Sequence, residues 1–410
     1  MAKDADIIII GAGASGMAAA VAALRTDPAV KVLLLERADR PGKKILVTGN
    51  GRCNLSKTEM DISSCYNGEA MHYKSVLRDF GDDIGFFRSL GLLTRTDEEG
   101  RVYPMSGQAS SVLDALRFAL SAAGAEIVCS AEVTRVESVS GSFSVHTADG
   151  RRFTSSEVII SAGSPAGVHG YENQNLFGSL RRMNIRIKEF SPALVQLTVK
   201  DLPAQLRGTR VRAVASLGND REGRVSRTGE VQFGDGYISG ICVMDLSRFY
   251  DGKTQKKLSL DMCPEMTAGE LENFIADAIS SRPDSDAAAV LSGIVPKAVG
   301  ETVLKTCCRD LYKRKAGSLS PEEISQTASM LKSLCFTVTG KGGFKSAQIC
   351  TGGVEGLERS SLMAPEVPGL YFCGEIVDVD GECGGYNLHW AWTSGRAAGT
   401  AAIGRLHQDQ

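Results

Sequence analysis

The sequence predicts an α/β protein whose parallel sheet is built from both ends of the chain, with a β-rich and a helical segment inserted between them. Residues 7–35 read as a strand, a glycine turn, a helix and a second strand. Short apolar strands that end in glycine recur near residues 160 and 372. Between about 191 and 345 the pattern changes to alternating strands and then to amphipathic helices. Strands that alternate with helices are typical of a parallel sheet.

The composition is that of a globular protein with more than one domain. The chain has 410 residues, of which 43% are hydrophobic and 23% charged, and its formal net charge is -2. One compact core seldom holds so long a chain, and the nearly neutral balance argues against polyanion binding by bulk charge. Its 11 cysteines lack the spacing of a disulfide framework, so we expect a reduced, cytoplasmic protein. Cys and His residues also lack zinc-ligand spacing, and we predict no metal site.

The N-terminal segment contains the elements of a dinucleotide-binding fold in order. An apolar strand at 6–10 runs into the glycine motif GAGASG at 11–16, and an alanine-rich helix follows. A second apolar strand, 30–35, ends at Glu36. A glycine motif alone is also typical of a turn inside a core, but together with the strand, the helix and the acid it predicts a Rossmann-type site. The same pattern explains the uncharged stretch 7–24 without a membrane span, so we expect no membrane segment.

The residues of this motif have separate physical roles. Gly11 permits the tight turn, Gly13 lets the backbone approach a pyrophosphate, and Gly16 lets the helix and strand pack closely. The N–H groups at the helix N-terminus then face the phosphate charge. Glu36 can accept hydrogen bonds from ribose hydroxyls.

The segment after Glu36 favours FAD over NAD. Residues 37–54 carry several basic side chains and the glycine-rich turn TGNGRCN, which would neutralise and wrap an extended ligand. A solvated basic loop is the alternative. The strands at 157–163 and 369–375 end in small residues or in Gly-Glu, which suits the edge of a bound cofactor.

The C-terminal segment extends the same pattern. The glycine-rich stretch 381–388 leads into a helix expected at 389–403. The N-terminus of that helix would stabilise negative charge on a reduced flavin. A glycine loop in which Asn387 only caps the helix is the alternative.

In the insertion, alternating patterns predict strands over 193–199, 209–216 and 230–233. Helical periodicity predicts helices over 267–279 and 321–334. Each helix is preceded by Thr or Ser with Glu three residues later, which is the pattern of a capping box.

Seven motifs together resemble the BaiN/RdsA-type NAD(P)/FAD-dependent oxidoreductases, also described as aminoacetone-oxidase-like flavoproteins. They are GAGASG, RPGKKILVTGNGRCNLS, GRVYPMS, SPALVQLTV, GYISG, GGFKSAQICTGGV and GLYFCGEIVDVDGECGGYNLHWAW. The resemblance covers essentially the whole chain. It implies a glutathione-reductase-like FAD domain (1–190 and 346–410), a β-barrel-like substrate domain (191–260 and 335–345) and a helical domain (261–334).

The expected contacts of the cofactor fall in the glycine motif, the acid, the basic loop and the C-terminal segments. The expected cofactor-binding residues are Gly11, Gly13, Ala14, Ser15, Gly16, Glu36, Arg37, Gly42, Lys43, Lys44, Gly51, Arg52, Cys53, Asn54, Val133, Ala162, Gly163, Gly374, Glu375, Gly385, Tyr386, Asn387 and Leu388.

The resemblance implies activities that differ widely. They are reduction of a uridine to dihydrouridine in large-subunit (23S) ribosomal RNA, bile-acid pathway reduction and aminoacetone oxidation. We expect NADH or NADPH to reduce FAD transiently, because no second glycine motif follows a strand. The flavin N5 would then pass hydride to a C=C bond while a side chain supplies the proton. Cys53 is the first candidate for this donor, followed by Tyr386, Cys383 and His389, and each has packing as its alternative role.

Basic residues cluster at two places in the insertion. Residues 205–227 and 294–319 each carry six basic residues against two acids. The four-residue spacing of Lys305, Arg309 and Lys313 predicts one helix face, which would follow a phosphate backbone or would simply be solvated. The expected RNA-binding residues are Arg207, Arg210, Arg212, Lys305, Arg309 and Lys313.

Three functions stay open at this point. An enzyme that forms dihydrouridine in ribosomal RNA is the leading one, a reductase or oxidase of a small molecule is the second, and a non-catalytic flavin redox sensor is the third. We expect a monomer or a weak homodimer.

Overall fold

The structure is a computed structural model with two compact units, and each is described by itself. It describes residues 3–139, 141–167, 174–218 and 223–408. The first unit is formed by residues 1–191 and 349–410, and the second by residues 192–348.

A five-stranded parallel sheet is the centre of the first unit. Its strands are β1 (Ile7–Ile10), β2 (Val32–Leu35), β7 (Glu126–Val128), β11 (Glu157–Ile160) and β20 (Leu370–Phe372). Their order is β20-β11-β1-β2-β7, and every neighbouring pair is parallel. All strands except β7 are fully buried, as expected for a sheet covered on both faces. Because β20 pairs with β11, the two ends of the chain build one sheet, and this prediction is confirmed.

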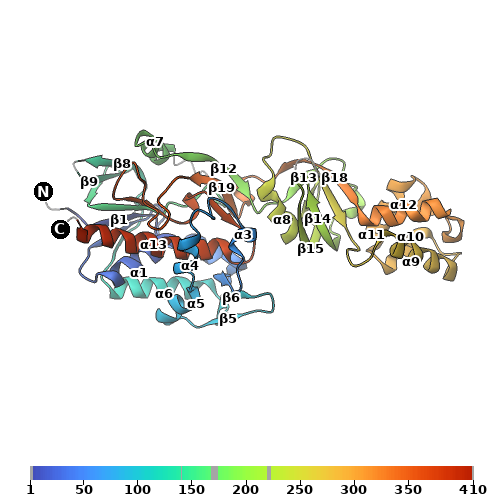
Figure 1. Cartoon of the computed structure of the whole chain (residues 1–410), viewed down its shortest axis with the longest axis horizontal. Helices are drawn as coiled ribbons and strands as arrows, with labels where there is room; N and C mark the ends of the chain where they lie inside the picture. The colour runs from blue at the N-terminus through green and yellow to red at the C-terminus, as the bar shows by residue number, and fades with distance from the viewer. Residues whose placement is uncertain (1–2, 140, 168–173, 219–222, 409–410) are drawn as a thin grey trace. The chain divides into compact units, whose positions relative to one another are not determined.

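Helices α1 (Ala14–Thr26) and α13 (Tyr386–Gln408) lie side by side in this unit (Figure 1). Two glycines of α13 permit the close approach. A Cβ on Gly395 would overlap the carbonyl oxygen of Ser15, and one on Gly399 would overlap that of Ala19. The C-terminal helix is thereby fixed against the helix that follows the glycine motif.

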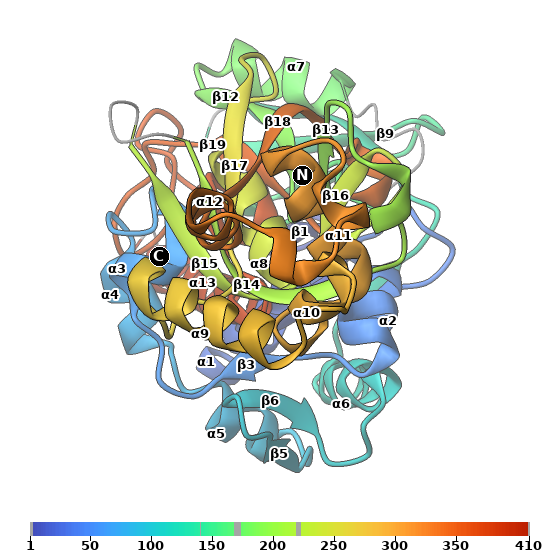
Figure 2. The ribbon, with the colours of Figure 1, turned by 90° about the vertical axis from the view of Figure 1, so that its right-hand side faces the viewer.

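Smaller elements surround this core. The other helices are α2 (Lys43–Val47), α3 (Ile62–Cys65), α4 (Lys74–Asp79), α5 (Asp83–Ser89), α6 (Ala109–Ala122) and α7 (Gln174–Arg182). The other strands are β3 (Ser56–Lys57), β4 (Tyr66–Gly68), β5 (Thr94–Thr96), β6 (Arg101–Pro104), β8 (Val133–Val139), β9 (Ser142–Thr147), β10 (Arg152–Ser155), β12 (Ile187–Ala193), β19 (Ile349–Val354) and β21 (Val379–Gly381). They form the small sheets β10-β9-β8, β3-β6-β5, β12-β19 and β21-β4. Figure 2 shows α5, α6, β5 and β6 together at the lower edge of the unit.

A closed six-stranded barrel is the main feature of the second unit. Its strands are β13 (Leu197–Val199), β14 (Arg210–Leu217), β15 (Val225–Phe233), β16 (Tyr237–Ser239), β17 (Lys256–Asp261) and β18 (Leu334–Lys341). They close in the order β13-β16-β15-β14-β17-β18. The helices are α8 (Ile241–Leu246), α9 (Ala268–Ser281), α10 (Ala287–Val290), α11 (Lys297–Cys307) and α12 (Pro321–Lys332). One hydrophobic cluster contains residues of both the barrel and the helices.

The structure confirms both capping boxes and corrects one strand. The side chains of Thr267 and Ser320 each accept a hydrogen bond from a Glu N–H three residues later, and each Glu carboxylate accepts one from the N–H of its capping residue. The strand predicted over 193–199 is wrong as one element, because β12 ends at Ala193 and β13 begins only at Leu197. Leu194 lies between them with φ +52°. Its side chain is buried. Because buried apolar residues are also typical of strands, the sequence pattern did not show the break at Leu194.

Candidate active site

The glycine turn between β1 and α1 is packed as its sequence predicts. Gly11 has φ +103°, and a Cβ there would lie 2.5 Å from the carbonyl oxygen of Ser161. A Cβ on Gly16 would overlap the carbonyl oxygen of Gly11. A side chain at Gly11 would push the turn away from the segment after β11, and one at Gly16 would push α1 away from the end of β1. The predicted tight turn and close helix–strand contact are therefore confirmed.

The N-terminus of α1 is open at Gly13 among the residues that the structure describes. Gly13 is the N-cap, and no side chain caps the first N–H groups of the helix. A Cβ on Gly13 would meet no atom within 4 Å. Unpaired N–H groups and the positive end of a 13-residue helix dipole suit a diphosphate. This end of α1 therefore fits the phosphates of the expected cofactor.

Glu36 at the end of β2 braces the glycine turn. Its Oε2 accepts a hydrogen bond from the Ala12 N–H at 2.9 Å, and its Oε1 accepts one from the Ala38 N–H at 2.8 Å. The Gly42 N–H also donates to the Ala12 carbonyl at 2.9 Å. The carboxylate is thus fixed beside the turn, where its remaining lone pairs can receive ribose hydroxyls.

Lys44 and Glu375 join the basic loop to the C-terminal Gly-Glu segment. Lys44 Nζ lies 2.6 Å from Glu375 Oε2. Glu375 Oε1 accepts hydrogen bonds from Ser164 Oγ at 2.7 Å and from the Cys350 N–H at 3.2 Å. Four segments from distant parts of the sequence therefore meet at one carboxylate.

The loop after α2 contains a cluster of left-handed residues. Gly49, Asn50, Gly51 and Cys53 have φ values of 55°, 55°, 81° and 54°. For the two residues other than glycine this conformation costs about 1–2 kcal/mol each. Such strain is typical of functional loops, where surrounding contacts impose it.

The GRCNLS and ECGGYNL motifs lie against each other. A Cβ on Gly385 would overlap the carbonyl oxygen of Ser56 and lie 2.9 Å from Asn54 Oδ1. Tyr66 Oη donates to the Tyr386 carbonyl at 2.8 Å, and β4 pairs with β21. The two motifs therefore form one surface at the N-terminus of α13.

Asn54 supplies a second observation that fits a ligand. Its Oδ1 is buried and has no hydrogen-bond partner among the residues that the structure describes. A buried acceptor left without a donor costs about 1–3 kcal/mol. A bound flavin nucleotide has N–H and O–H groups that could satisfy this atom, so the residues present fit the cofactor. Asn387, by contrast, is bonded through its amide to both the N–H and the carbonyl of Gly381.

The four predicted proton donors have different surroundings. Cys53 is fully buried, and burial raises the pKa of its thiol to about 11. Cys383 is half-buried. Tyr386 is buried and packs edge-on against Tyr66, with 5.7 Å between ring centroids. His389 is 5% exposed, and its Nδ1 lies 2.6 Å from a buried carboxylate.

That carboxylate belongs to Asp83. The sequence predicts no role for Asp83, nor for Ser56 and Arg396. Arg396 Nη2 lies 2.8 Å from Asp83 Oδ1, and Ser56 Oγ donates to Asp83 Oδ2 at 2.7 Å. In the sequence Asp83 resembles an ordinary acid at the start of a helix. Only the pairing of two consecutive acids, Asp82 and Asp83, could have indicated that one of them does more than cap α5.

The other predicted cofactor residues lie around these groups. Ser15 Oγ donates to the Cys373 carbonyl at 3.4 Å, and the Arg52 guanidinium lies 5.3 Å from the centre of the Tyr103 ring. Lys43 pairs with Asp39 at 2.5 Å on the surface. Val133 is buried and Arg37 is exposed, whereas Ala14, Ala162, Gly163 and Leu388 are half-buried. Gly163 and Gly374 have φ values of 71° and 75°.

The single helix face predicted for Lys305, Arg309 and Lys313 is wrong. Helix α11 ends at Cys307 because Cys308 is extended, with φ -154° and ψ 132°. Arg309 therefore lies in a turn and Lys313 in a separate 3₁₀ helix, so they share no helix face with Lys305. A four-residue spacing places residues on one face only while the helix continues.

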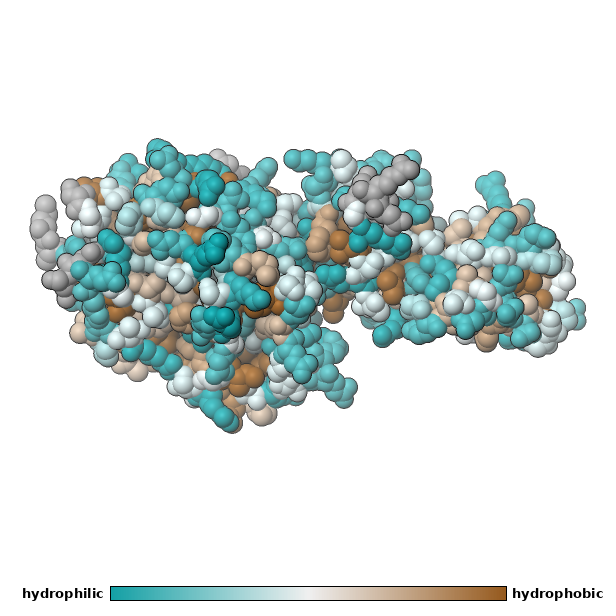
Figure 3. Space-filling view, in the orientation of Figure 1, coloured by the Kyte–Doolittle hydropathy of each residue, from teal (hydrophilic) through white to brown (hydrophobic). Residues whose placement is uncertain are grey.

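Several of these cations also have partners. Lys305 lies 3.7 Å from Glu301, donates to Gln205 Oε1 at 2.9 Å and lies over the Tyr312 ring. Arg207 pairs with Asp235 and Arg210 with Glu230, each at 3.2 Å. Arg212 is exposed. Figure 3 shows hydrophilic and hydrophobic residues interspersed over the visible face of this unit.

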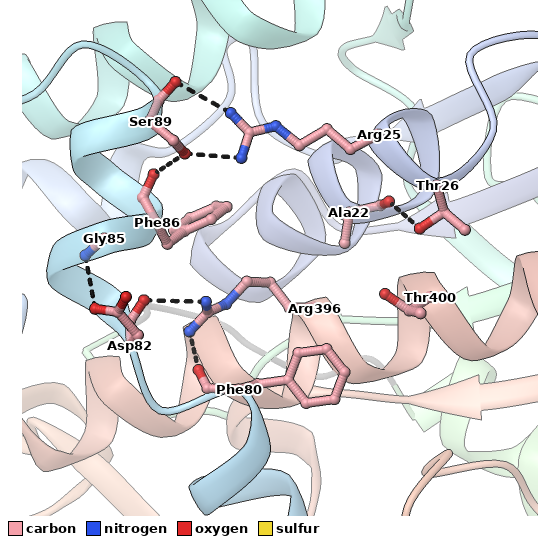
Figure 4. Close-up of a pocket in the computed structure, with 10 residues that line it drawn as sticks. All are labelled: Ala22, Arg25, Thr26, Phe80, Asp82, Gly85, Phe86, Ser89, Arg396 and Thr400. Carbon is pink, nitrogen blue, oxygen red and sulfur yellow. Dashed lines mark hydrogen bonds between the residues drawn. The ribbon is translucent and has the colours of Figure 1, made fainter.

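A surface pocket of about 380 Å³ lies away from the glycine turn. It is lined by Ala22, Arg25 and Thr26 from the C-terminal half of α1, together with residues of α5 and α13 (Figure 4). The phosphate-binding end of a helix is its N-terminus. The pocket is therefore not the place of the nucleotide phosphates.

Within the described residues no group of three or more His, Cys, Asp or Glu side chains is arranged to hold a metal ion. The same part of the chain contains no helix with the length and hydropathy needed to cross a bilayer.

The parallel sheet, the open N-terminus of α1 and the braced acid at the end of β2 define a Rossmann-type nucleotide-binding protein. A comparison with family profiles identifies which one. The profile described as "HI0933-like protein Rossmann domain" matches residues 5–401, and the chain belongs to this family. It is an FAD-dependent oxidoreductase.

Two curated relatives illustrate the range of the family. The chain is 37% identical to a 3-dehydro-bile acid delta(4,6)-reductase of Clostridium scindens, over 97% of this chain and 98% of the relative. It is 27% identical to the ribosomal RNA dihydrouridine synthase of Escherichia coli, over 95% of this chain and 96% of the relative.

Solved structures support the fold alone. A 3-ketosteroid delta1-dehydrogenase from Sterolibacterium denitrificans has a TM-score of 0.53 at 12% identity, over 98% of this chain and 99% of the other. A quinol-fumarate reductase has a TM-score of 0.52 at 12% identity, over 99% of this chain and 72% of the other.

Proposed function

We propose that this protein reduces a conjugated C=C bond in a small apolar ketone of the bile-acid class, with NADH or NADPH as the source of electrons. The name of the relative with 37% identity supports this substrate class. The observation that favours a small molecule over RNA is that the predicted basic stripe does not form. Helix α11 ends before Arg309, and Lys305 is held by Glu301 and Gln205. An apolar substrate needs no such stripe.

Different residues of the first unit would have different roles in this reaction. FAD, when bound, supplies the hydride. The N-terminus of α1 would hold the diphosphate and Glu36 the adenosine ribose. The Lys44–Glu375 pair and Asn54 would hold the middle and the ring end of the cofactor. The N-terminus of α13 would direct the positive end of its dipole toward the flavin, which favours its reduced, more negative form.

Reduction of a uridine in large-subunit ribosomal RNA is the second candidate. Relatives with that name, 27% and 24% identical over nearly the whole chain, favour it. Arg212, Arg309 and Lys313 are exposed and could still contact phosphates. Under this candidate, charge reversal at Arg309 and Lys313 would abolish RNA modification and leave FAD bound.

An anaerobic stopped-flow experiment separates the candidates. The flavin is first reduced with NADH or NADPH, and the reduced protein is then mixed with a 3-oxo-4-ene bile acid or with a 23S ribosomal RNA transcript. We expect reoxidation by the bile acid and none by the RNA. Reoxidation by RNA alone, with dihydrouridine found by mass spectrometry, would establish the second candidate instead. A flavin that neither nicotinamide reduces would favour the redox sensor.

A further inference from the structure

A buried carboxylate joins three segments of the first unit. Asp83 is 1% exposed, and its two oxygens accept hydrogen bonds from three side chains. Ser56 Oγ lies 2.7 Å and His389 Nδ1 lies 2.6 Å from Oδ2, and Arg396 Nη2 lies 2.8 Å from Oδ1. The segments are β3, the start of α5 and the first three turns of α13.

Local sequence features place Asp83, His389 and Arg396 in this network. Asp82 is the N-cap of α5 and accepts from the Gly85 N–H at 2.7 Å, which leaves the next residue, Asp83, to point inward. His389 and Arg396 are seven residues apart on α13, so they lie on one face of that helix. His389 lies four residues after Gly385, in the first turn of α13, and its N–H donates to the Gly385 carbonyl at 2.9 Å.

Arg396 is held from two sides. It donates to the carbonyls of Phe80 and Asp82, and its guanidinium lies 4.7 Å from the centre of the Phe86 ring (Figure 4). Its side chain is 11% exposed. Burial lowers the pKa of Arg396, and the two acids oppose this, so the guanidinium stays charged. This guanidinium lies 2.8 Å from Asp83 Oδ1 and forms an ion pair with the carboxylate.

The ionised Asp83 decides where the protons lie. An ionised carboxylate only accepts hydrogen bonds, so Nδ1 of His389 must carry a proton. The second proton of the imidazole can then be gained or lost only at Nε2. Among the residues that the structure describes, Nε2 has no hydrogen-bond partner. A hydrogen bond at Nδ1 therefore orients the His389 ring, and Nε2 is available for proton transfer.

We propose that His389 is the acid that protonates the substrate, and that Asp83, Arg396 and Ser56 are its positioning residues. This inference rests on the proposed function. Bound FAD would supply hydride to one carbon of the C=C bond, with the two electrons drawn from the nicotinamide cofactor. Nε2 of His389 would give its proton to the π electron pair at the neighbouring carbon, and the neutral ring would then regain a proton from water.

The charged groups of this network are the Asp83 carboxylate on α5, which His389 contacts directly, and the Arg396 guanidinium on α13, which contacts the other oxygen of the same carboxylate. Cys53 is less suited to the role, because a thiol with a pKa raised to about 11 is a weak acid near neutral pH.

The decisive variant is His389→Asn. The Asn amide nitrogen can donate to Asp83 as Nδ1 does, while the group that titrates is gone. We expect unchanged FAD binding and unchanged flavin reduction by NAD(P)H, with reoxidation by the substrate slowed about 100- to 10,000-fold. His407→Asn removes a surface imidazole that lies 2.9 Å from Asp27, and it should behave as wild type. Normal reoxidation in His389→Asn would overturn the proposal.

Asp83→Asn tests the positioning role through the tautomer of His389. An amide can donate as well as accept a hydrogen bond, so Nδ1 no longer has to carry the proton. We expect the Nε2–H tautomer to appear in the ¹⁵N-histidine NMR spectrum and reoxidation by the substrate to slow, while Ser56→Ala changes both less. A wild-type spectrum and a wild-type reoxidation rate in Asp83→Asn would show a merely structural role and overturn the assignment of Asp83.

A spectroscopic measurement separates this inference from the proposed function. The chain has five histidines, so ¹⁵N-histidine NMR can identify the His389 signals by their loss in His389→Asn. We expect the neutral ring to carry its proton on Nδ1, and the opposite tautomer would overturn the positioning. This result does not depend on the substrate. A wild type that reduces no bile acid refutes the proposed function instead.

Discussion

Lys44 Nζ and Glu375 Oε2 lie 2.6 Å apart, although 331 residues separate them in the sequence. The pair joins the loop after the glycine motif to the segment after β20. Both side chains are partly exposed, at 44% and 21%, so the pair contributes at most about 1 kcal/mol to stability. Its position beside the expected cofactor indicates a role in binding rather than in folding.

We therefore expect Glu375→Gln to weaken FAD binding more than it weakens the fold. The amide cannot pair with Lys44 but can still accept from Ser164. The dissociation constant of FAD should rise about 10-fold, the equivalent of 1.4 kcal/mol, while the melting temperature of the apoprotein changes little. Fluorescence titration and thermal unfolding measure the two effects. Equal FAD affinity in the variant and the wild type would contradict the assigned role.

The glycine motif allows a matched pair of variants. Gly13→Ala adds a Cβ that meets no atom within 4 Å, so the apoprotein should keep its stability and lose affinity for FAD. Gly16→Ala places a Cβ over the Gly11 carbonyl and should destabilise the apoprotein by about 1–3 kcal/mol. Urea unfolding and FAD titration of both variants test this. Full FAD affinity in Gly13→Ala would refute the phosphate site at α1.

The Asp83–Arg396 pair should show the penalty of an unpaired buried charge. Asp83→Ala leaves the guanidinium of Arg396 without its carboxylate and should cost about 3–5 kcal/mol in the free energy of unfolding. The double variant Asp83→Ala with Arg396→Met should lose less than the sum of the single losses, because it removes both charges. A double-mutant cycle by urea unfolding gives the coupling energy. Additive losses would show that the two residues do not interact.

Buried thiols should make the fold weaker at alkaline pH. Burial raises the pKa of Cys53 from an ordinary value of 9.0 to about 11. Between these values the unfolded chain has lost this proton and the folded chain keeps it, so stability falls as pH rises from about 9 to 11. Cys53→Ala should fall less steeply over this interval. Urea unfolding at several pH values measures the slope, and equal slopes would contradict the buried environment.

Labelling should distinguish the cysteines near neutral pH. Cys308 and Cys335 are exposed, whereas Cys373 is fully buried and burial raises its pKa to about 12. We expect iodoacetamide to modify the two exposed residues first and Cys373 only after unfolding. Mass spectrometry of the digested protein would identify the modified sites.

The sequence by itself determined the parallel sheet and the nature of its ligand. Apolar runs such as Ile7–Ile10 can be buried only in a covered sheet, and a glycine motif between a strand and a helix leaves few alternatives to a nucleotide. Capping boxes at Thr267 and Ser320 were equally predictable, because they depend on residues within one turn. Local rules specify such features, so one sequence is enough to find them.

Only the tertiary structure decided which distant side chains meet. Ser56, Asp83 and His389 carry no shared spacing, and their contact depends on α13 returning to lie against α1. The sequence also did not predict that α11 ends before Arg309, because the spacing of charges does not indicate where a helix ends. A sequence pattern reflects the geometry of residues that are near one another in the chain. A buried hydrogen-bond network depends instead on how distant segments pack together, and the pattern does not show which segments those are.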